Sequence, residues 1–313
     1  MLVYLNNQKG VALVTVLLIA GIVSVMALSM TSSQQIDIRR TANIIESERA
    51  LWLVKGVETW GVCLLMRDNV SGGNDNLGED WAQGMLPTGI DGAFVSGELE
   101  DLQGRININN LVSVLTVGQA TLKGETWSQL TRLFERCEID PAALYKVLDW
   151  IDPDVDAQGY GAEDEYYLVQ ETPYRAANRL MVSPTELRAV GDISEEGYQC
   201  LAPNISTLPY DTYINVNTVP PGVIAALGDD ISLAVAEEVV DERPIDGFAS
   251  IAEFRNLPQF AGKDMDIVFL TDRSEYFLAT SRARVGRQDI VMYSLVAKKS
   301  DKVSVLSRSI GVY

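Results

Sequence analysis

Histidine is absent from all 313 residues of the chain. Without imidazole there is no Ser-His or Cys-His catalytic pair and no His-ligated zinc site. Basic residues are also scarce, with 25 Lys and Arg against 43 Asp and Glu, which gives a formal net charge of -18. A surface of this sign repels phosphate backbones, so we expect no nucleic-acid partner.

Cysteine is rare as well. Cys63, Cys137 and Cys200 allow one disulfide bridge and leave one thiol. In an oxidising compartment we expect the bridge between Cys137 and Cys200, and we expect Cys63 to be a buried thiol. The composition, 47% hydrophobic and 22% charged, excludes a disordered, collagen-like or disulfide-dense small protein.

Charge disappears entirely between Val11 and Met30, and twenty helical residues span about 30 Å, the thickness of a bilayer core. We therefore predict a membrane-spanning helix over residues 11–30. A cleaved signal peptide is the alternative, although its apolar region normally has about 7 to 15 residues. Residues 31–68 lack proline and predict a continuation of the same helix. Ile38, Ile45 and Trp52 are spaced by seven, which predicts an apolar stripe that packs on a soluble body.

Strand patterns surround a helical block. Residues 69–110 and 271–313 predict one antiparallel sheet, with two short strands around a turn at Gly104 and three C-terminal strands over 275–285, 290–297 and 303–310. Residues 272–313 hold eight basic and four acidic groups. This excess of positive charge indicates either a solvated sheet face or a docking surface for an acidic partner.

Residues 111–270 predict an inserted α-helical domain, with helices over 126–136, 141–150, 183–190, 223–227 and 231–240. The fold class is therefore α+β. An I-N-[IV]-N core occurs twice, at residues 106–109 and 214–217, and the second copy leads into a pair of helices that resembles a helix-hairpin-helix (SAM-like) unit. Residues 214–265 carry nine acidic and three basic groups, so we interpret the unit as structural and not as a DNA-binding element.

Seven carboxylates and no basic group lie between residues 149 and 165. Asp152, Asp154, Asp156 and Glu163 have the spacing of positions 1, 3, 5 and 12 of an EF-hand loop, which predicts bound calcium. Ala157 stands where an EF-hand has glycine, so we expect a calcium loop but not a true EF-hand. A solvated acidic loop and an acid–base pair of a calcium-dependent hydrolase are the alternatives. No phosphate-binding glycine loop or G-x-S-x-G motif supports an enzyme.

The N-terminus resembles the type IV pilins and the pseudopilins of type II secretion, because a short leader ending in Gly10 precedes a retained apolar helix. The resemblance implies a leader of residues 1–10, cleavage between Gly10 and Val11 by a prepilin peptidase, and methylation of the new N-terminus. The chain departs from the family at the fifth mature position, where Thr15 replaces the usual Glu. A subunit with no neighbour ahead of it in the fibre has no use for that charge.

Several further segments resemble the GspK family, the minor pseudopilin K of type II secretion. They are LQGRININNL (102–111), LDWIDPD (148–154), GAEDEYY (161–167), TPYRAANRLMVSPTELRAVGD (172–192) and INVNTVPP (214–221). The resemblance implies a pilin-like fold with a helical insertion and bound calcium. A second calcium ion would draw in Asp164.

The same resemblance implies a function without catalysis. The chain would form the tip of the periplasmic pseudopilus and take part in the export of folded proteins. It would be a single-pass inner-membrane protein with its body in the periplasm. Its partners would be the I- and J-type minor pseudopilins, the prepilin peptidase, the inner-membrane secretion platform and inner-membrane lipid. The alternative function is that of a membrane-anchored helix-hairpin-helix protein of DNA uptake.

Overall fold

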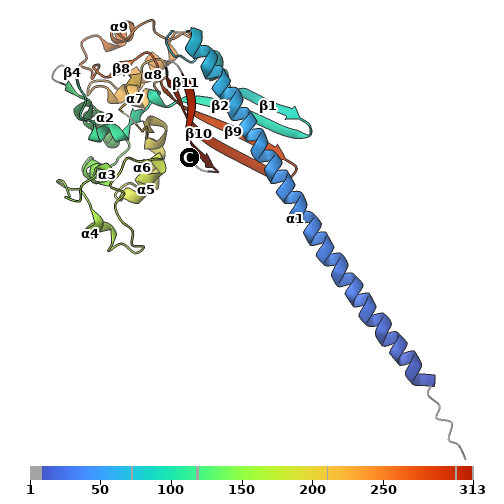
Figure 1. The fold of residues 1–313 in the computed structure, drawn as a ribbon. Helices are drawn as coiled ribbons and strands as arrows, with labels where there is room; N and C mark the ends of the chain where they lie inside the picture. Colours follow the sequence, from blue (N-terminus) through green and yellow to red (C-terminus); the bar gives the residue numbers. More distant parts are fainter. Residues whose placement is uncertain (1–8, 72, 118–119, 210, 300–301, 312–313) are drawn as a thin grey trace, which may run out of the picture.

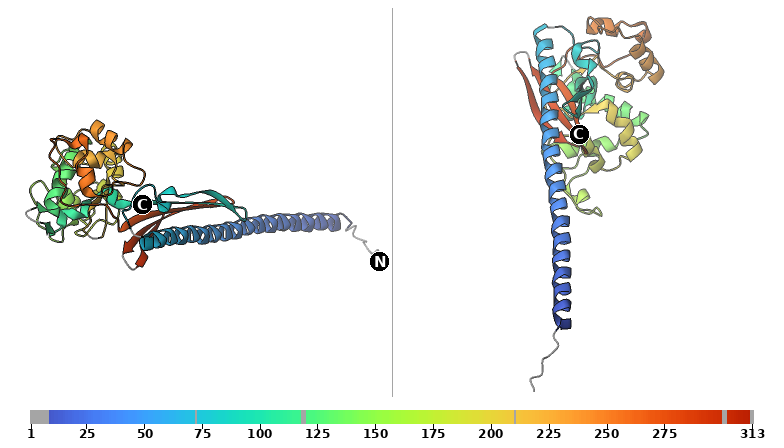
Figure 2. Two further views of the ribbon diagram at one scale, coloured as in Figure 1. Left: turned by 90° about the horizontal axis from the view of Figure 1, so that it is seen from above. Right: turned by 90° about the vertical axis from the view of Figure 1, so that its right-hand side faces the viewer.

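The computed structural model describes residues 9–71, 73–117, 120–209, 211–299 and 302–311. Figure 1 shows one long helix, α1, a five-stranded sheet that packs on it, and a head of short helices. Both views in Figure 2 place the head far from the N-terminal end of α1, and the right-hand view shows it beside the upper part of that helix. The predicted α+β class, with a long N-terminal helix packed on an antiparallel sheet, is confirmed.

Helix α1 runs from Lys9 to Ser71 without interruption. At 1.5 Å per residue it is about 95 Å long. Its most apolar stretch has a mean hydropathy of 2.8 and no buried residue, so this helix is long and apolar enough to cross a membrane. The predicted leader of residues 1–10 lies largely outside the described residues, and of its members only Lys9 and Gly10 are seen, in the first turn of α1.

The face of α1 that packs on the sheet is not the predicted one. Its core residues are Ala50, Val54, Val57, Leu64 and Leu65, all nearly or fully buried. The three residues of the predicted stripe are exposed instead, so that prediction was wrong.

Two close contacts distinguish the face of α1 that packs on the sheet. Val57 lies against Gly97 of the sheet, where an added Cβ would approach it to 2.5 Å, and Gly61 of the helix lies against Leu99. Isoleucine or tryptophan in such positions would hold the helix away from the sheet. Glycine at these two contacts therefore lets α1 lie close to the sheet, and larger side chains such as Leu64 and Leu65 pack on the same face.

The sheet is antiparallel, in the order β1-β2-β9-β10-β11. Its strands are β1 (Met85–Ile90), β2 (Ala93–Asp101), β9 (Tyr276–Val285), β10 (Gln288–Lys299) and β11 (Lys302–Ile310). Alternate side chains of β2, beginning with Ala93 and Val95, are buried beneath α1, as the period of two requires. The three C-terminal strands lie where the sequence predicted them.

The predicted turn at Gly104 is present, but the strand that follows it does not join the antiparallel sheet. After β2 the chain forms a short 3-10 turn, Leu102–Gly104, and then β3 (Ile106–Asn107), which pairs in parallel with β6 (Ile205–Ser206) and not with β2. Gly104 is required for close approach, because an added Cβ would lie 2.7 Å from the carbonyl oxygen of Thr218. Strand β2 pairs antiparallel with β9 on one side and with β1 on the other, and β1 is the strand that the sequence did not predict.

The head contains most of the helices. They are α2 (Leu122–Arg136), α3 (Ala143–Ile151), α4 (Asp164–Tyr167), α5 (Leu187–Val190), α6 (Glu195–Leu201), α7 (Pro221–Ala226), α8 (Leu233–Asp241) and α9 (Ile251–Arg255). Short strands β4 (Thr116–Val117), β5 (Ala120–Thr121), β7 (Ile214–Asn215) and β8 (Leu270–Thr271) complete it. One core, which includes Phe134, Trp150 and Leu201, joins the helices into a single unit.

The cysteines differ in their surroundings. Cys137 directly follows α2 and Cys200 lies in α6, and their Sγ atoms are joined with 5.7 Å between the Cα atoms. Cys63 is free and exposed, so the prediction of a buried thiol was wrong. It lies on the face of α1 that points away from the sheet.

Candidate metal site and family

The end of helix α3 begins the candidate metal site. Asp149 lies in its last turn and Asp152 caps its C-terminus. The loop that follows returns to Glu163, the residue before α4. Gly161 permits this return, because any side chain there would collide with the carboxylate of Asp149. That carboxylate in turn accepts from the backbone N–H of Gln158.

Three of the predicted ligands converge. Asp152, Asp154 and Glu163 each offer a carboxylate oxygen within 4.8 Å of the others, and Asp152 and Glu163 are buried. Burial, followed by the neighbouring carboxylates, raises the pKa of Glu163 to about 7 and that of Asp152 to about 6. Like charges held this close in a buried site require a cation or a proton.

The hydrogen bonds around these carboxylates indicate whether a cation or a proton fits the site. Oδ1 of Asp152 and both carboxylate oxygens of Glu163 are buried and accept no hydrogen bond. The side-chain amide of Asn178 donates to the carbonyl of Asp154 at 2.7 Å, while its own Oδ1 is also buried without a donor. Four buried oxygen acceptors without donors, and no nitrogen or sulfur ligand, fit a hard cation such as calcium.

Two predicted ligands lie elsewhere in the structure. Asp156 is exposed and outside the group, and Asp164 pairs with Arg175 at 2.9 Å and accepts from the N–H of Ala176. The sequence missed Asn178. It lies outside the acidic segment, so no ligand spacing could have identified it.

Comparisons with known proteins identify the family of the chain. Two family models, both described as type II secretion system protein K, match residues 104–210 and 214–271. Type II secretion system protein K of Pseudomonas aeruginosa is 35% identical, over 98% of this chain and 94% of that protein. The chain belongs to the type II secretion system protein K family.

Other protein K relatives extend the likeness. The one from Pectobacterium carotovorum is 31% identical, over 98% of each chain. Among solved structures, the GspK-GspI-GspJ complex from enterotoxigenic Escherichia coli contains a chain that this one matches with a TM-score of 0.77 and 25% identity. That match covers 88% of this chain and all of the other. As a protein K, the chain is a minor pseudopilin of type II secretion.

The alternative of DNA uptake finds no support in the comparisons, and the structure adds a physical reason against it. The segment that resembles a helix-hairpin-helix unit contains α7 and α8, and Arg243 follows α8. The guanidinium of Arg243 donates to the carbonyl oxygens of Asn217 and Val219, and its burial lowers its pKa to about 10. This arginine holds the protein K head together and is not available to a phosphate.

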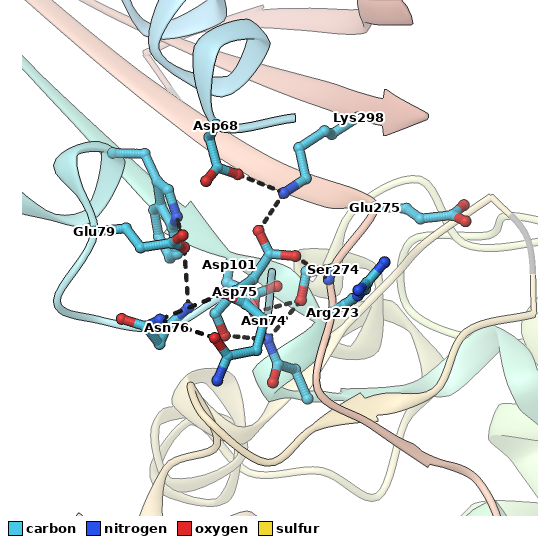
Figure 3. A network of polar contacts seen from close by, with 12 residues as sticks. Asp68, Asn74, Asp75, Asn76, Glu79, Asp101, Arg273, Ser274, Glu275 and Lys298 are labelled. Atoms are coloured by element: carbon cyan, nitrogen blue, oxygen red, sulfur yellow. Dashed lines mark hydrogen bonds and ion pairs between the residues drawn. The ribbon is translucent and has the colours of Figure 1, made fainter. Parts of the chain in front are cut away.

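A second acidic group lies where the head of protein K meets its body (Figure 3). Asp68 at the end of α1 and Asp75 just beyond it both bind the ammonium of Lys298 on β10, and the distance to Asp68 is 2.7 Å. Asp75 also accepts from the N–H of Ser274 at 2.7 Å. This group already holds its cation, a lysine, so we assign it no metal.

Asp101, at the end of β2, extends the same network into the head. It accepts from Ser274 at 2.6 Å, from Thr218 at 2.5 Å and from Asn215 at 3.0 Å. Asn215, fully buried, also donates to the carbonyl of Asp75. We call Asp68, Asp75, Asp101, Asn215, Ser274 and Lys298 the polar junction. It joins the end of α1, the sheet and the head at one point.

We expect Glu79, beside the polar junction, to make the stability of the fold depend on pH. Burial and a hydrogen bond with Asp68 raise its pKa to about 7. A carboxyl whose pKa is raised on folding stabilises the fold below its unfolded pKa, near 4.5, and loses that contribution as the pH rises through 7. Glu79→Gln should therefore flatten the decline in melting temperature between pH 5 and 8, measured on the full chain in detergent with saturating calcium. Exposed Glu196→Gln is the control, and an unaltered slope in Glu79→Gln would contradict the assignment.

Proposed function

We propose that this minor pseudopilin forms the tip of the periplasmic pseudopilus and so takes part in the export of folded proteins. One observation carries the proposal: the head lies beside the end of α1 that is far from the apolar N-terminal segment (Figures 1 and 2). A head of this size would obstruct a subunit stacked above it. At the end of a fibre it obstructs nothing.

The N-terminal segment supports the same position. We infer cleavage between Gly10 and Val11 by the prepilin peptidase, which makes Thr15 the fifth residue of the mature chain. Its hydroxyl donates to the carbonyls of Val11 and Ala12 within the helix. It therefore brings no charge that a preceding subunit would have to neutralise.

We further propose that residues 11–30 anchor the chain in the inner membrane with the body in the periplasm, where a bridge between Cys137 and Cys200 is stable. The partners would be the I- and J-type minor pseudopilins and the inner-membrane secretion platform. The role would be assembly, with no catalysis.

Labelling of assembled pseudopili tests the tip position. A gold label on the head of the full-length chain should appear at one end of each fibre and not along it. The matched control is the same label on the major pseudopilin, which should decorate the whole shaft. Decoration by the head label along the shaft would overturn the proposal.

We also propose that Asp152, Asp154, Glu163 and Asn178 hold calcium, with Asp156 and Asp164 as further ligands if the loop closes on the ion. Bound calcium would supply positive charge only and would fix the loop between α3 and α4. Its contribution is therefore to stability: a ligand at 100 times its Kd stabilises by about 2.7 kcal/mol.

A chelator should therefore lower the melting temperature of the full chain by about 5–10 °C. Glu163→Gln should abolish most of this shift, because it removes a buried charge that faces the ion. Glu165→Gln changes an exposed carboxylate two residues away and should keep the shift. Equal melting with and without chelator in the unmodified chain would exclude a structural calcium ion.

A further inference from the structure

The outer face of the sheet, which lies opposite α1, is covered by the head at one end and open at the other. Leu278 and Leu295, at the covered end, pack with Leu208 of the head. At the other end Phe94 of β2 is 60% exposed, and Arg284, which stands opposite it on β9, is exposed as well. The open end therefore presents an aromatic ring beside a guanidinium.

An open cavity of about 400 Å³ lies at this end of the outer face. We call it the outer pocket, and it is lined by Pro87, Phe94, Val95, Ser96, Arg282 and Arg284. Gly89 of β1 pairs with Phe94 and has no side chain that would cover the ring, from which an added Cβ would lie 3.9 Å away. A cavity of this size takes a small ligand or a few side chains. It is too small for an α-helix, which is about 10–12 Å across with its side chains.

A single carboxylate serves both arginines of the outer pocket. Asp289 accepts from Arg282 at 2.9 and 2.6 Å and from Arg284 at 3.3 Å. Hydrogen bonds from Arg282 hold the pKa of Asp289 down at about 2, so it is ionised at neutral pH and the three side chains together carry one positive charge. The fork of Arg282 is occupied by this carboxylate. Arg284 meets it through one nitrogen only, so most of its five N–H donors can serve a ligand.

The lining of the outer pocket selects a carboxylate that stands next to an apolar side chain. A guanidinium matches a carboxylate in shape and charge, and among the described residues that line the pocket none is acidic. Phe94 and Pro87 offer apolar surface to an aromatic or branched side chain. The surroundings agree, because residues 272–313 hold eight basic and four acidic groups on a chain of net charge -18.

Two contacts with α1 fix the position of the outer pocket along the molecule. Arg49 donates to the carbonyl of Asp91 in the turn between β1 and β2, and Glu46 accepts from the N–H of Arg287 in the turn between β9 and β10. The pocket therefore lies at the end of the sheet that faces the N-terminal half of α1. Glu46 is about 24 Å along the helix from Met30, so the bilayer does not reach the pocket.

We propose that the outer pocket binds a loop of the minor pseudopilin directly below this chain in the fibre, with a carboxylate of that loop on Arg284 and the apolar side chain next to it on Phe94. The inference rests on the proposed function, because a subunit at the tip has neighbours only on its membrane side. It places a contact on the sheet, away from α1, and gives the partner segment a chemical class. The probes are the I- and J-type minor pseudopilins of the same secretion system.

Photo-cross-linking identifies the occupant. p-Benzoylphenylalanine in place of Phe94, in the full-length chain co-expressed in membranes with the I- and J-type subunits, should cross-link to one of them. Mass spectrometry should find Asp or Glu within about two residues of the linked position. The same photoreactive residue in place of Leu86, which is 82% exposed on β1 but does not line the pocket, is the control and should give at most about a tenth of that product. A linked peptide without a carboxylate, or linkage to a second copy or to an exported protein, would overturn the proposal.

Two arginines provide a matched pair of substitutions. Arg284→Gln removes the guanidinium that the partner carboxylate needs, and it should lower the amount of co-purified partner by about tenfold. Arg287→Gln makes the same change at an exposed arginine that does not line the pocket, and it should have no effect. Both variants should melt like the unmodified chain. Exchange of the linked partner carboxylate for arginine should restore binding to Arg284→Glu and weaken binding to the unmodified chain.

The outcomes separate the two proposals. A complex that forms normally with Arg284→Gln, with no cross-link at Phe94, would overturn the outer pocket as a contact and leave the proposed function standing. The absence of any complex with the unmodified chain would contradict the proposed function itself.

Discussion

Replacing Lys298 by methionine is expected to lower the free energy of unfolding by about 3–5 kcal/mol at pH 7. The substitution removes the ammonium that both Asp68 and Asp75 contact, while Asp75 remains 3% exposed beneath the sheet. Burial already raises the pKa of Asp75 to about 6, despite the attraction of Lys298. An uncompensated carboxylate there would be expensive to keep ionised.

The same reasoning gives the pH dependence of this loss. Without Lys298 the pKa of Asp75 rises further, so the carboxyl takes up a proton under mildly acidic conditions. The loss should therefore be smaller at pH 5.5 than at pH 7.5. Denaturation of the full chain in detergent, with saturating calcium, measures it at both values. Lys302→Met, at an exposed lysine that begins the next strand, β11, is the control and should change the stability by less than about 0.5 kcal/mol.

A double variant provides the sharper measurement. Asp75→Asn with Lys298→Met removes the ammonium together with the more deeply buried of its two carboxylate partners. It should be more stable than Lys298→Met alone, because the buried charge of Asp75 is then no longer left without its ammonium. A single variant as stable as the unmodified chain would mean that the ammonium is dispensable. The polar junction would then not be what holds the head in place.

The elements that the sequence predicted are those that local patterns determine. An uncharged, proline-free run identified α1, and alternation identified the C-terminal strands. Asp152, Asp154 and Glu163 were predicted to be close together because ligand spacing within one loop is a local property. Strand β1 escaped notice because Pro87 and Gly89 weaken its strand signal, which is tolerable at the edge of a sheet.

What could not be predicted depends on contacts between distant segments. The size and hydrophobicity of Ile38 and Trp52 favoured their stripe as the packed face. In the structure the face of Val57 packs on the sheet instead, where Gly97 leaves room for it. The residues of the polar junction are spread along the sequence from Asp68 to Lys298, so no local sequence spacing could have indicated that they meet. Asn178 likewise becomes relevant to the acidic loop only when the chain between Glu163 and α5 folds back beside it.

Loss of the bridge between Cys137 and Cys200 is the other large effect we expect. The sequence separation of the two cysteines is 63, and a closed loop of this length predicts a loss of about 4 kcal/mol in Cys200→Ser by the chain-entropy relation. The bridge ties the end of α2 to α6, and Cys137 lies within the core of the head. The loss should therefore appear as a lower melting temperature of the head.

Cys63→Ser is the matched control, because it removes a thiol that is exposed and free. It should melt like the unmodified chain. A reductant should lower the melting of the unmodified chain and of Cys63→Ser to that of Cys200→Ser, and it should leave Cys200→Ser unchanged. If Cys200→Ser melted with the control under oxidising conditions, the head would owe its stability to its apolar core, and the bridge would be incidental to it.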